Sequence, residues 1–178
     1  MPAKEAKDRF LTLLDIYFDP EEYLARVHST RDYIKEKIPQ GFTPHVALTL
    51  GSGGLGEIAH VINRVATIPY EEIPGFKKTT IDGHLGFLIA GYISDIPVIG
   101  YQGRQHYYEL GNQPNQVIAL KNLTFPVYVA RALGAELYFA TNAGGGLNPD
   151  YKQGDLMIIE SHIGIHFPNP LLGPPVEF

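Results

Sequence analysis

Apolar residues recur at helical spacing near the N-terminus. Asp19 is followed by a proline and two glutamates, a pattern typical of helix starts because it combines a side-chain acceptor, a proline at the first position and acids in the first turn. The apolar positions that follow at helical intervals are Leu24, Val27, Ile34 and Ile38. A Pro-Gln-Gly sequence at 39–41 then ends the pattern. We therefore expect residues 1–41 to form a helical segment that packs on a sheet.

The rest of the chain, 42–178, contains short apolar runs of the buried-strand type. These runs predict strands at residues 45–50, 86–92, 97–101, 136–141 and 155–160. Helices are predicted at 57–63 and at 115–133, the second one ending at Gly134. Strands that alternate with helices predict an α/β domain with a largely parallel or mixed sheet. No repeat or linker divides the 178 residues, so we expect a single domain.

Composition narrows the range of partners. A hydrophobic content of 44% and a charged content of 19% are typical of a folded protein. The net charge of −5 gives no basic surplus, so neither nucleic acid nor a membrane is expected as a partner, and an anion would need a local set of donors. Cysteine is absent, and the N-terminus lacks the apolar stretch of a signal peptide. These features favour a cytoplasmic protein.

A glycine-rich loop follows the first predicted strand. The sequence GSGGLG at 51–56 matches G-x-G-x-x-G, the pattern of dinucleotide-binding loops. Closely spaced glycines also let backbone N–H groups approach any anion, to which Ser52 adds a hydroxyl donor. The motif by itself leaves three interpretations open: a dinucleotide site, another anion site, or a structural turn.

A cluster of polar side chains follows the strand predicted at 97–101. Arg104 offers a fork of donors that suits phosphate. In an extended segment His106 and Tyr108 would point to the same side as Arg104, because side chains alternate along a strand. Glu109 could orient the ring of His106 or hold its proton, and Tyr108 could lie along a sugar. The alternative is a solvated polar loop.

A third loop, at 141–148, follows the strand predicted at 136–141. Its sequence TNAGGGLN contains Asn142, Ala143 and Gly144, and its three successive glycines would bring the backbone close to a ligand. His84 is flanked by glycines that would expose its ring. A metal site is not expected, because His162 and His166 lack a third ligand.

In this order, the segments resemble the purine nucleoside phosphorylase and methylthioadenosine phosphorylase family. The matching pieces are GSGGLG, EIPGF, GHLG, YQGRQHYYE, LTFPVYVARALG, TNAGGGLN, GDLMIIESHI and NPLLGP. The resemblance implies a mixed, partly closed β-sheet flanked by helices. It also implies reversible phosphorolysis of purine nucleosides to a free purine and ribose 1-phosphate, with inorganic phosphate as co-substrate and no cofactor. The dinucleotide interpretation is displaced, since the glycine loop then becomes one anion-binding segment among several.

The resemblance also implies roles for individual residues. The phosphate-binding set would be Ser52, His84, Arg104, His106 and Ala143. Tyr108 would lie against the ribose, and Glu109 would support His106, which makes that pair the catalytic candidates. Asn142 and Gly144 are further candidates in the same loop as Ala143.

The motifs LTFP and TNAGGGLN favour the inosine- and guanosine-type enzymes, whereas the GRQH sequence is closer to methylthioadenosine phosphorylases. A homotrimer is implied by the first type. The chain ends soon after NPLLGP, so we expect it to be a partial phosphorylase domain, truncated at the C-terminus and without phosphorolysis activity by itself. The alternatives are a methylthioadenosine phosphorylase and a non-catalytic subunit that keeps only the phosphate site.

Overall fold

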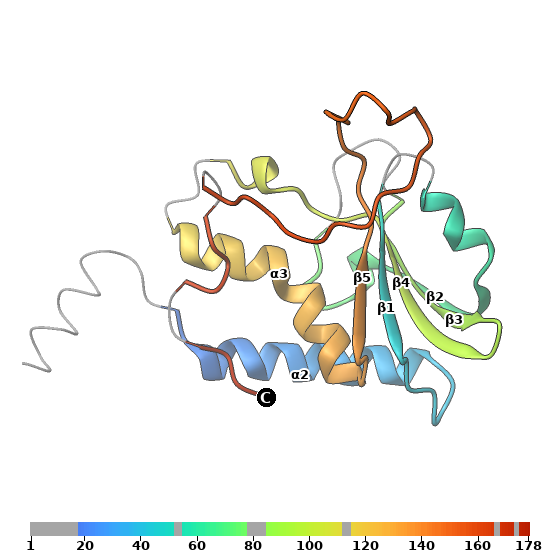
Figure 1. The fold of residues 1–178 in the computed structure, drawn as a ribbon. Coiled ribbons are helices and arrows are strands. Elements are labelled where there is room, and N and C mark those ends of the chain that lie inside the picture. The colour runs from blue at the N-terminus through green and yellow to red at the C-terminus, as the bar shows by residue number, and fades with distance from the viewer. Residues whose placement is uncertain (1–17, 52–54, 78–84, 112–114, 166–167, 173–174) are drawn as a thin grey trace, which may run out of the picture.

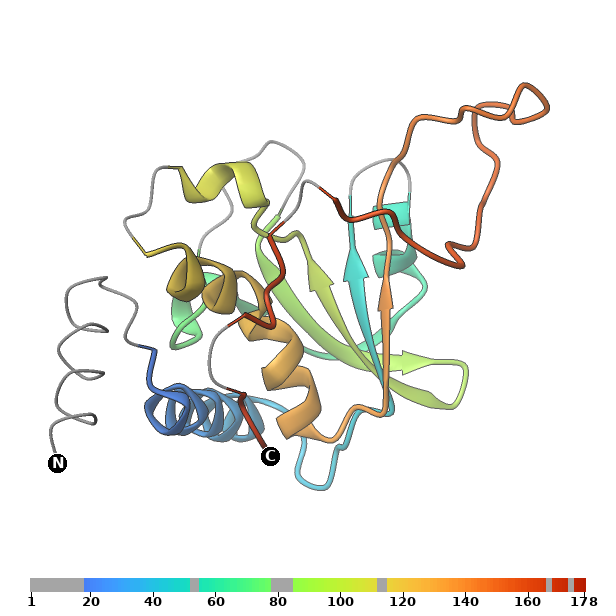
Figure 2. The same cartoon turned by 60° about the vertical axis from the view of Figure 1, so that its left-hand side comes forward.

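The computed structural model describes residues 18–51, 55–77, 85–111, 115–165, 168–172 and 175–178. In these residues five strands form one open, mixed sheet in the order β2-β3-β4-β1-β5. The strands are β1 (Val46–Leu50), β2 (Asn63–Pro69), β3 (Phe87–Ile93), β4 (Ile96–Gln102) and β5 (Leu137–Ala140). The two long helices, α2 (Pro20–Lys37) and α3 (Gln116–Leu133), lie on the same side of this sheet, as Figures 1 and 2 show. The predicted α/β class with a mixed sheet and flanking helices is confirmed, but the sheet of the described residues is open rather than partly closed, because β2 and β5 form its two edges and do not pair.

Helix α2 begins where the sequence predicts. The carboxylate of Asp19 accepts hydrogen bonds from the backbone N–H groups of Glu21 and Glu22, at 2.8 and 3.2 Å. Val27 and Ile34 are fully buried on the face that packs against α3 and the sheet. Because Asp19 satisfies backbone donors that would otherwise lack partners, it fixes the start of the helix.

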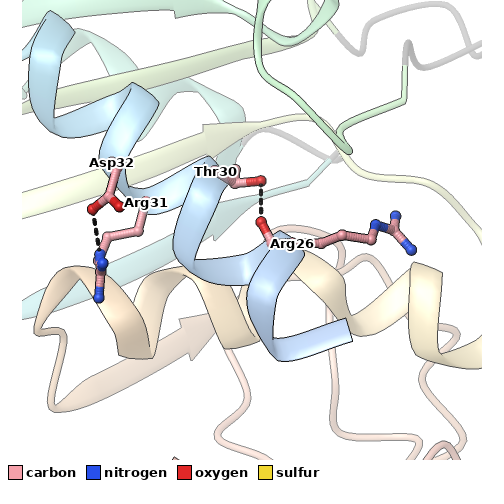
Figure 3. A network of polar contacts seen from close by, with 4 residues as sticks. All are labelled: Arg26, Thr30, Arg31 and Asp32. Atoms are coloured by element: carbon pink, nitrogen blue, oxygen red, sulfur yellow. Dashed lines mark hydrogen bonds and ion pairs between the residues drawn. The ribbon is translucent and has the colours of Figure 1, made fainter. Parts of the chain in front are cut away.

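One buried hydroxyl ties α2 to the segment that follows β2. Oγ1 of Thr30 lies 2.9 Å from the carbonyl oxygen of Arg26 and 2.8 Å from that of Pro74. Figure 3 shows the contact with Arg26, together with the ion pair between Arg31 and Asp32, the two residues that follow Thr30. The contact with Pro74 fixes the backbone just before residues 75–77, which reach the cavity described below.

Helix α3 covers the central strands. Phe125, Val129 and Leu133 are buried in the same core as Ala47 of β1 and Ile99 of β4. Asn115 accepts a hydrogen bond from the N–H of Ile118 at the start of the helix. Gly134 ends it in the left-handed region (φ 109°), as predicted. No helix in the described part of the chain is long and apolar enough to cross a membrane.

The register of the sheet brings three strand ends to one edge. Strand β1 is parallel to both β4 and β5, whereas β3 is antiparallel to β2 and β4. Leu50 pairs with Gln102, and Thr49 pairs with Ala140. The loops that begin at residues 51, 103 and 141 therefore leave the sheet side by side, as expected of the carboxyl ends of parallel strands.

Two predictions of secondary structure are wrong. The helix predicted at 57–63 is a 3₁₀ turn at Leu55–His60, and Asn63 instead opens β2, which was not predicted. Ala66 and Ile68 are the more buried positions of β2, and they alternate with exposed residues because only one face of this edge strand is covered.

The strand predicted at 155–160 is also absent. These residues are exposed and pair with no strand among the described residues, although Leu156 and Ile158 are apolar. An apolar run forms a strand only where a partner backbone satisfies its N–H and C=O groups. After β5 the chain instead leaves the sheet, as the orange segment in Figure 2 shows.

Candidate phosphate and sugar site

A cavity of about 490 Å³ lies where the ends of β1, β4 and β5 meet the middle of α3. Its wall combines aromatic rings and hydroxyl groups with the charged side chains of Arg104 and Lys77. The residues used below are Thr49, Tyr70, Tyr101, Arg104, Tyr138 and Asn142. The volume is within the range of small-molecule sites, and the lining offers donors for an anion.

Buried tyrosines form the inner wall. The hydroxyl of Tyr70 donates to the carbonyl of Gly103 at 2.8 Å, and that of Tyr101 donates to the carbonyl of Pro126 at 2.9 Å. Burial raises the pKa of both phenols well above the usual value. The two groups therefore stay neutral donors and hold the backbone on either side of the cavity.

The Arg104 loop is held at its first residue. Gly103 has φ +102°, a conformation that favours glycine, and its N–H donates to the carbonyl of Leu50 at 3.2 Å. With its carbonyl bound by Tyr70, both backbone groups of Gly103 are fixed. Arg104 follows directly, is exposed, and lines the cavity.

His106 and Glu109 form the pair that the sequence suggested. Oε1 of Glu109 lies 3.0 Å from Nδ1 of His106 and accepts a hydrogen bond from its backbone N–H at 2.6 Å. These contacts cap the 3₁₀ turn at Tyr107–Leu110. When Nδ1 donates to the carboxylate, the contact fixes the tautomer and the direction of the imidazole ring.

The predicted extended arrangement of this loop is wrong at Tyr108, because the 3₁₀ turn begins at Tyr107 and ends the alternation of side chains. The rings of Tyr108 and His106 nevertheless stack, with centroids 5.0 Å apart and planes 20° from parallel. Tyr108 is 70% exposed and is not part of the cavity wall. Its outer face is open to a ligand that lies over the loop.

Thr141 joins two of the glycine-containing loops. Its hydroxyl donates to the carbonyl of Thr49 at 2.8 Å and accepts from the N–H of Gly51 at 3.0 Å. A side chain at Gly51 would place Cβ 2.7 Å from the carbonyl oxygen of Thr141, so only glycine permits this approach. The first residues of both loops are thereby fixed relative to each other.

The predicted site residues fall into three groups. Arg104, Asn142 and Ala143 line the cavity, and the amide of Asn142 donates to the carbonyl of Ala143 at 3.0 Å. His106, Tyr108 and Glu109 lie on the adjoining turn, while Gly144 is exposed beyond the wall. Ser52 and His84 lie outside the described residues.

Sequence reasoning missed the hydroxyl-bearing wall formed by Thr49, Tyr70, Tyr101 and Tyr138. For Thr49, Tyr101 and Tyr138 the available signal was a polar or amphipathic residue within an otherwise apolar strand, one or more positions before the strand end, whereas Tyr70 lies in the 3₁₀ turn that follows β2. The residues of the described part of the chain form no group of three or more side chains that could hold a metal ion.

Comparisons with known proteins identify the family to which the sequence is similar. A family model described as "Phosphorylase superfamily" matches residues 45–177. Purine nucleoside phosphorylase 1 of Bacillus subtilis (strain 168) is 41% identical over 149 residues, which cover 84% of this chain and 51% of the relative. Purine nucleoside phosphorylase 1 of Geobacillus stearothermophilus is 42% identical over 148 residues, covering 83% and 50% respectively. Purine nucleoside phosphorylase of Bos taurus is 42% identical over 137 residues, covering 75% and 45%. The chain thus spans about half the length of these curated relatives.

The Thr141 contact leads to a stability prediction. Replacing Thr141 by valine keeps the side-chain shape but leaves the buried N–H of Gly51 without its acceptor, so we expect a loss of about 1–3 kcal/mol in the free energy of unfolding. Thr141→Ser keeps the hydroxyl and is the matched control, expected to lose less than about 1 kcal/mol. Urea denaturation of both variants measures the difference. Equal losses in the two variants would contradict the role given to the hydroxyl.

Proposed function

The chain belongs to the phosphorylase superfamily, and we propose that it forms the phosphate- and ribose-binding part of a purine nucleoside phosphorylase. The observation that carries the proposal is the convergence of two strand-end loops, those after β4 and β5, on one cavity that contains Arg104, in a chain about 41% identical to proteins of that name. The reaction is the phosphorolysis of a purine nucleoside to a free purine and ribose 1-phosphate. We infer inosine and guanosine as substrates from the motifs shared with that type of enzyme.

Phosphate is the nucleophile, and the protein's main task is to place it. The guanidinium of Arg104 supplies the positive charge, His106 supplies a hydrogen bond through Nε2, and Ala143 supplies its backbone N–H. Ser52 and His84 complete the proposed set. Holding phosphate below the anomeric carbon turns an encounter of two ligands into a reaction within one complex, which lowers its entropic cost.

In the reaction a phosphate oxygen bonds to the anomeric carbon while the bond from that carbon to the purine nitrogen breaks. The bonding electrons leave with the purine nitrogen, which takes up a proton. Positive charge develops on the sugar as in glycoside cleavage, and the phosphate anion next to it stabilises that charge. Glu109, by holding Nδ1 of His106, keeps the imidazole turned toward the phosphate.

The sugar is assigned to the exposed side of the same loop. Tyr108 stacks on His106 and leaves its outer face open, so a ribose bound beside the phosphate would rest on an apolar surface. Asn142 and Gly144 lie on the loop that follows β5 and are further candidates for contacts with the ligand.

The direct test is a phosphate-dependent assay on the protein that carries this chain. Inosine and guanosine should each release free purine and ribose 1-phosphate only when phosphate is added.

Arg104→Ala should raise the phosphate KM or lower kcat/KM at least about tenfold, because it removes a charge-assisted pair of hydrogen bonds. Arg131→Ala is the control, since that arginine lies in the last turn of α3 away from the cavity. Purine release without phosphate would contradict the proposed function, and unchanged phosphate kinetics in a folded Arg104→Ala variant would remove Arg104 from the site.

The pairing of His106 with Glu109 predicts coupled effects. If Glu109 acts by orienting His106, then Glu109→Gln and His106→Ala should each lower kcat/KM, and the double variant should lose less than the product of the two losses. A double-mutant cycle on kcat/KM for phosphate measures this coupling. Multiplicative losses would mean that the two side chains act independently.

We also propose that the protein assembles as a homotrimer, on its resemblance to the inosine- and guanosine-type enzymes. The expected result is a mass of three chains by light scattering at concentrations used in the assay. A monomeric mass under the same conditions would rule the trimer out.

A further inference from the structure

Two hydroxyl groups meet at the floor of the cavity, and neither has a role in the function proposed above. Oγ1 of Thr49 and the phenolic oxygen of Tyr138 lie 2.5 Å apart, on the neighbouring strands β1 and β5. Both residues line the cavity, together with Arg104. The Tyr138 ring stacks on that of Tyr101, with centroids 6.4 Å apart and planes 28° from parallel, so its direction is fixed.

The two hydroxyl groups of Thr49 and Tyr138 carry two protons, and the hydrogen bond between them uses only one. Each hydroxyl carries one proton and can also accept, so one hydrogen bond between them uses a single proton and leaves one O–H group. Within the described residues, neither hydroxyl makes another hydrogen bond. One neutral donor is therefore available at this point of the cavity wall.

Burial decides which oxygen keeps the available proton. Thr49 is only 4% exposed, whereas Tyr138 is half-buried and borders the open space. A buried hydroxyl that does not donate loses a hydrogen bond that water cannot replace, and Tyr138 is the acceptor within its reach. Burial therefore favours Thr49 as the donor to Tyr138, the arrangement that leaves the proton of Tyr138 to point toward the cavity.

The charge of Arg104 acts on the same phenol. Burial raises the pKa of Tyr138, while the hydrogen bond from Thr49 and the positive charge of Arg104 oppose part of that rise. The phenol therefore keeps its proton near neutral pH, and the guanidinium lies close enough to influence it. A ligand anion drawn to Arg104 would find this neutral donor beside it.

We propose that Tyr138 is a further binding residue of the site, donating its phenolic proton to an oxygen of the phosphate that Arg104 holds, with Thr49 as its positioning residue. The inference rests on the proposed function, because it takes the ligand to be phosphate. Phosphate suits the arrangement chemically: a guanidinium fork engages two of its oxygens, and further oxygens need donors that carry no charge of their own.

The test measures the affinity for inorganic phosphate by isothermal titration calorimetry on the protein that carries this chain. Tyr138→Phe should raise the phosphate Kd about tenfold, as expected for the loss of one hydrogen bond to a charged acceptor. Thr49→Val, which leaves the phenol without its orienting partner, should raise it roughly two- to fourfold, and Thr49→Ser should restore it. The Tyr138→Phe, Thr49→Val double variant should match Tyr138→Phe alone, since Thr49 acts only through Tyr138.

Tyr92→Phe is the matched control. It removes the same oxygen from a half-buried tyrosine of the same sheet that does not reach the cavity, and it should leave the phosphate Kd unchanged. An unchanged phosphate Kd in Tyr138→Phe overturns the inference. It is also overturned if Thr49→Ser binds phosphate no more tightly than Thr49→Val. If the unaltered protein binds no phosphate, the proposed function itself fails. If all variants bind phosphate as tightly as the unaltered protein does, the proposed function stands and only the role of Tyr138 fails.

Discussion

The contact between Thr141, Thr49 and Gly51 fixes the geometry on which the rest of the site depends. Parallel pairing of β1 with β4 and β5 brings three strand ends to one edge, but it leaves the direction of the following loops open. The Thr141 hydroxyl removes part of that freedom, because it bonds both the carbonyl before the first loop and the N–H at its start. Gly103 is held in the same way by Leu50 and Tyr70. The loops thus begin from fixed positions, although their later residues are exposed.

The local chemistry of the cavity differs from that of the whole chain. With a net charge of −5, the protein has no general field that attracts an anion. The cavity instead combines the charged side chains of Arg104 and Lys77 with phenols that burial keeps protonated. The phenols of Tyr70 and Tyr101 donate to backbone carbonyls, whereas that of Tyr138 borders the open space. Neutral donors in a partly buried site can hold an anion without adding repulsion between cations, and their attraction is stronger there than in water.

Much of the fold and part of the site could be predicted from local sequence. Strands β1, β3, β4 and β5 and helices α2 and α3 were recognised because each carries an apolar run or a capping residue within its own span. The contact between His106 and Glu109 was foreseen for the same reason, since three positions along one turn place the two side chains together. The strand expected at 155–160 failed because its formation depends on a partner backbone, which local sequence does not reveal. Thr49 and Tyr138 escaped notice because they are 89 positions apart and meet only through the register of β1 and β5.

The site divides into a fixed floor and an exposed upper part, and this division bears on how a ligand binds. Thr49, Tyr70 and Tyr101 are buried and hold defined hydrogen bonds, so they lose little freedom when a ligand arrives. Arg104 and Tyr108 are exposed side chains, and ordering them costs free energy that contacts with the ligand must offset. Phosphate that reaches the floor and engages Arg104 would order the start of the loop that also carries His106 and Tyr108. A sugar binding afterwards would meet a surface already partly arranged, so the two ligands would bind with positive coupling without any large change in the fold.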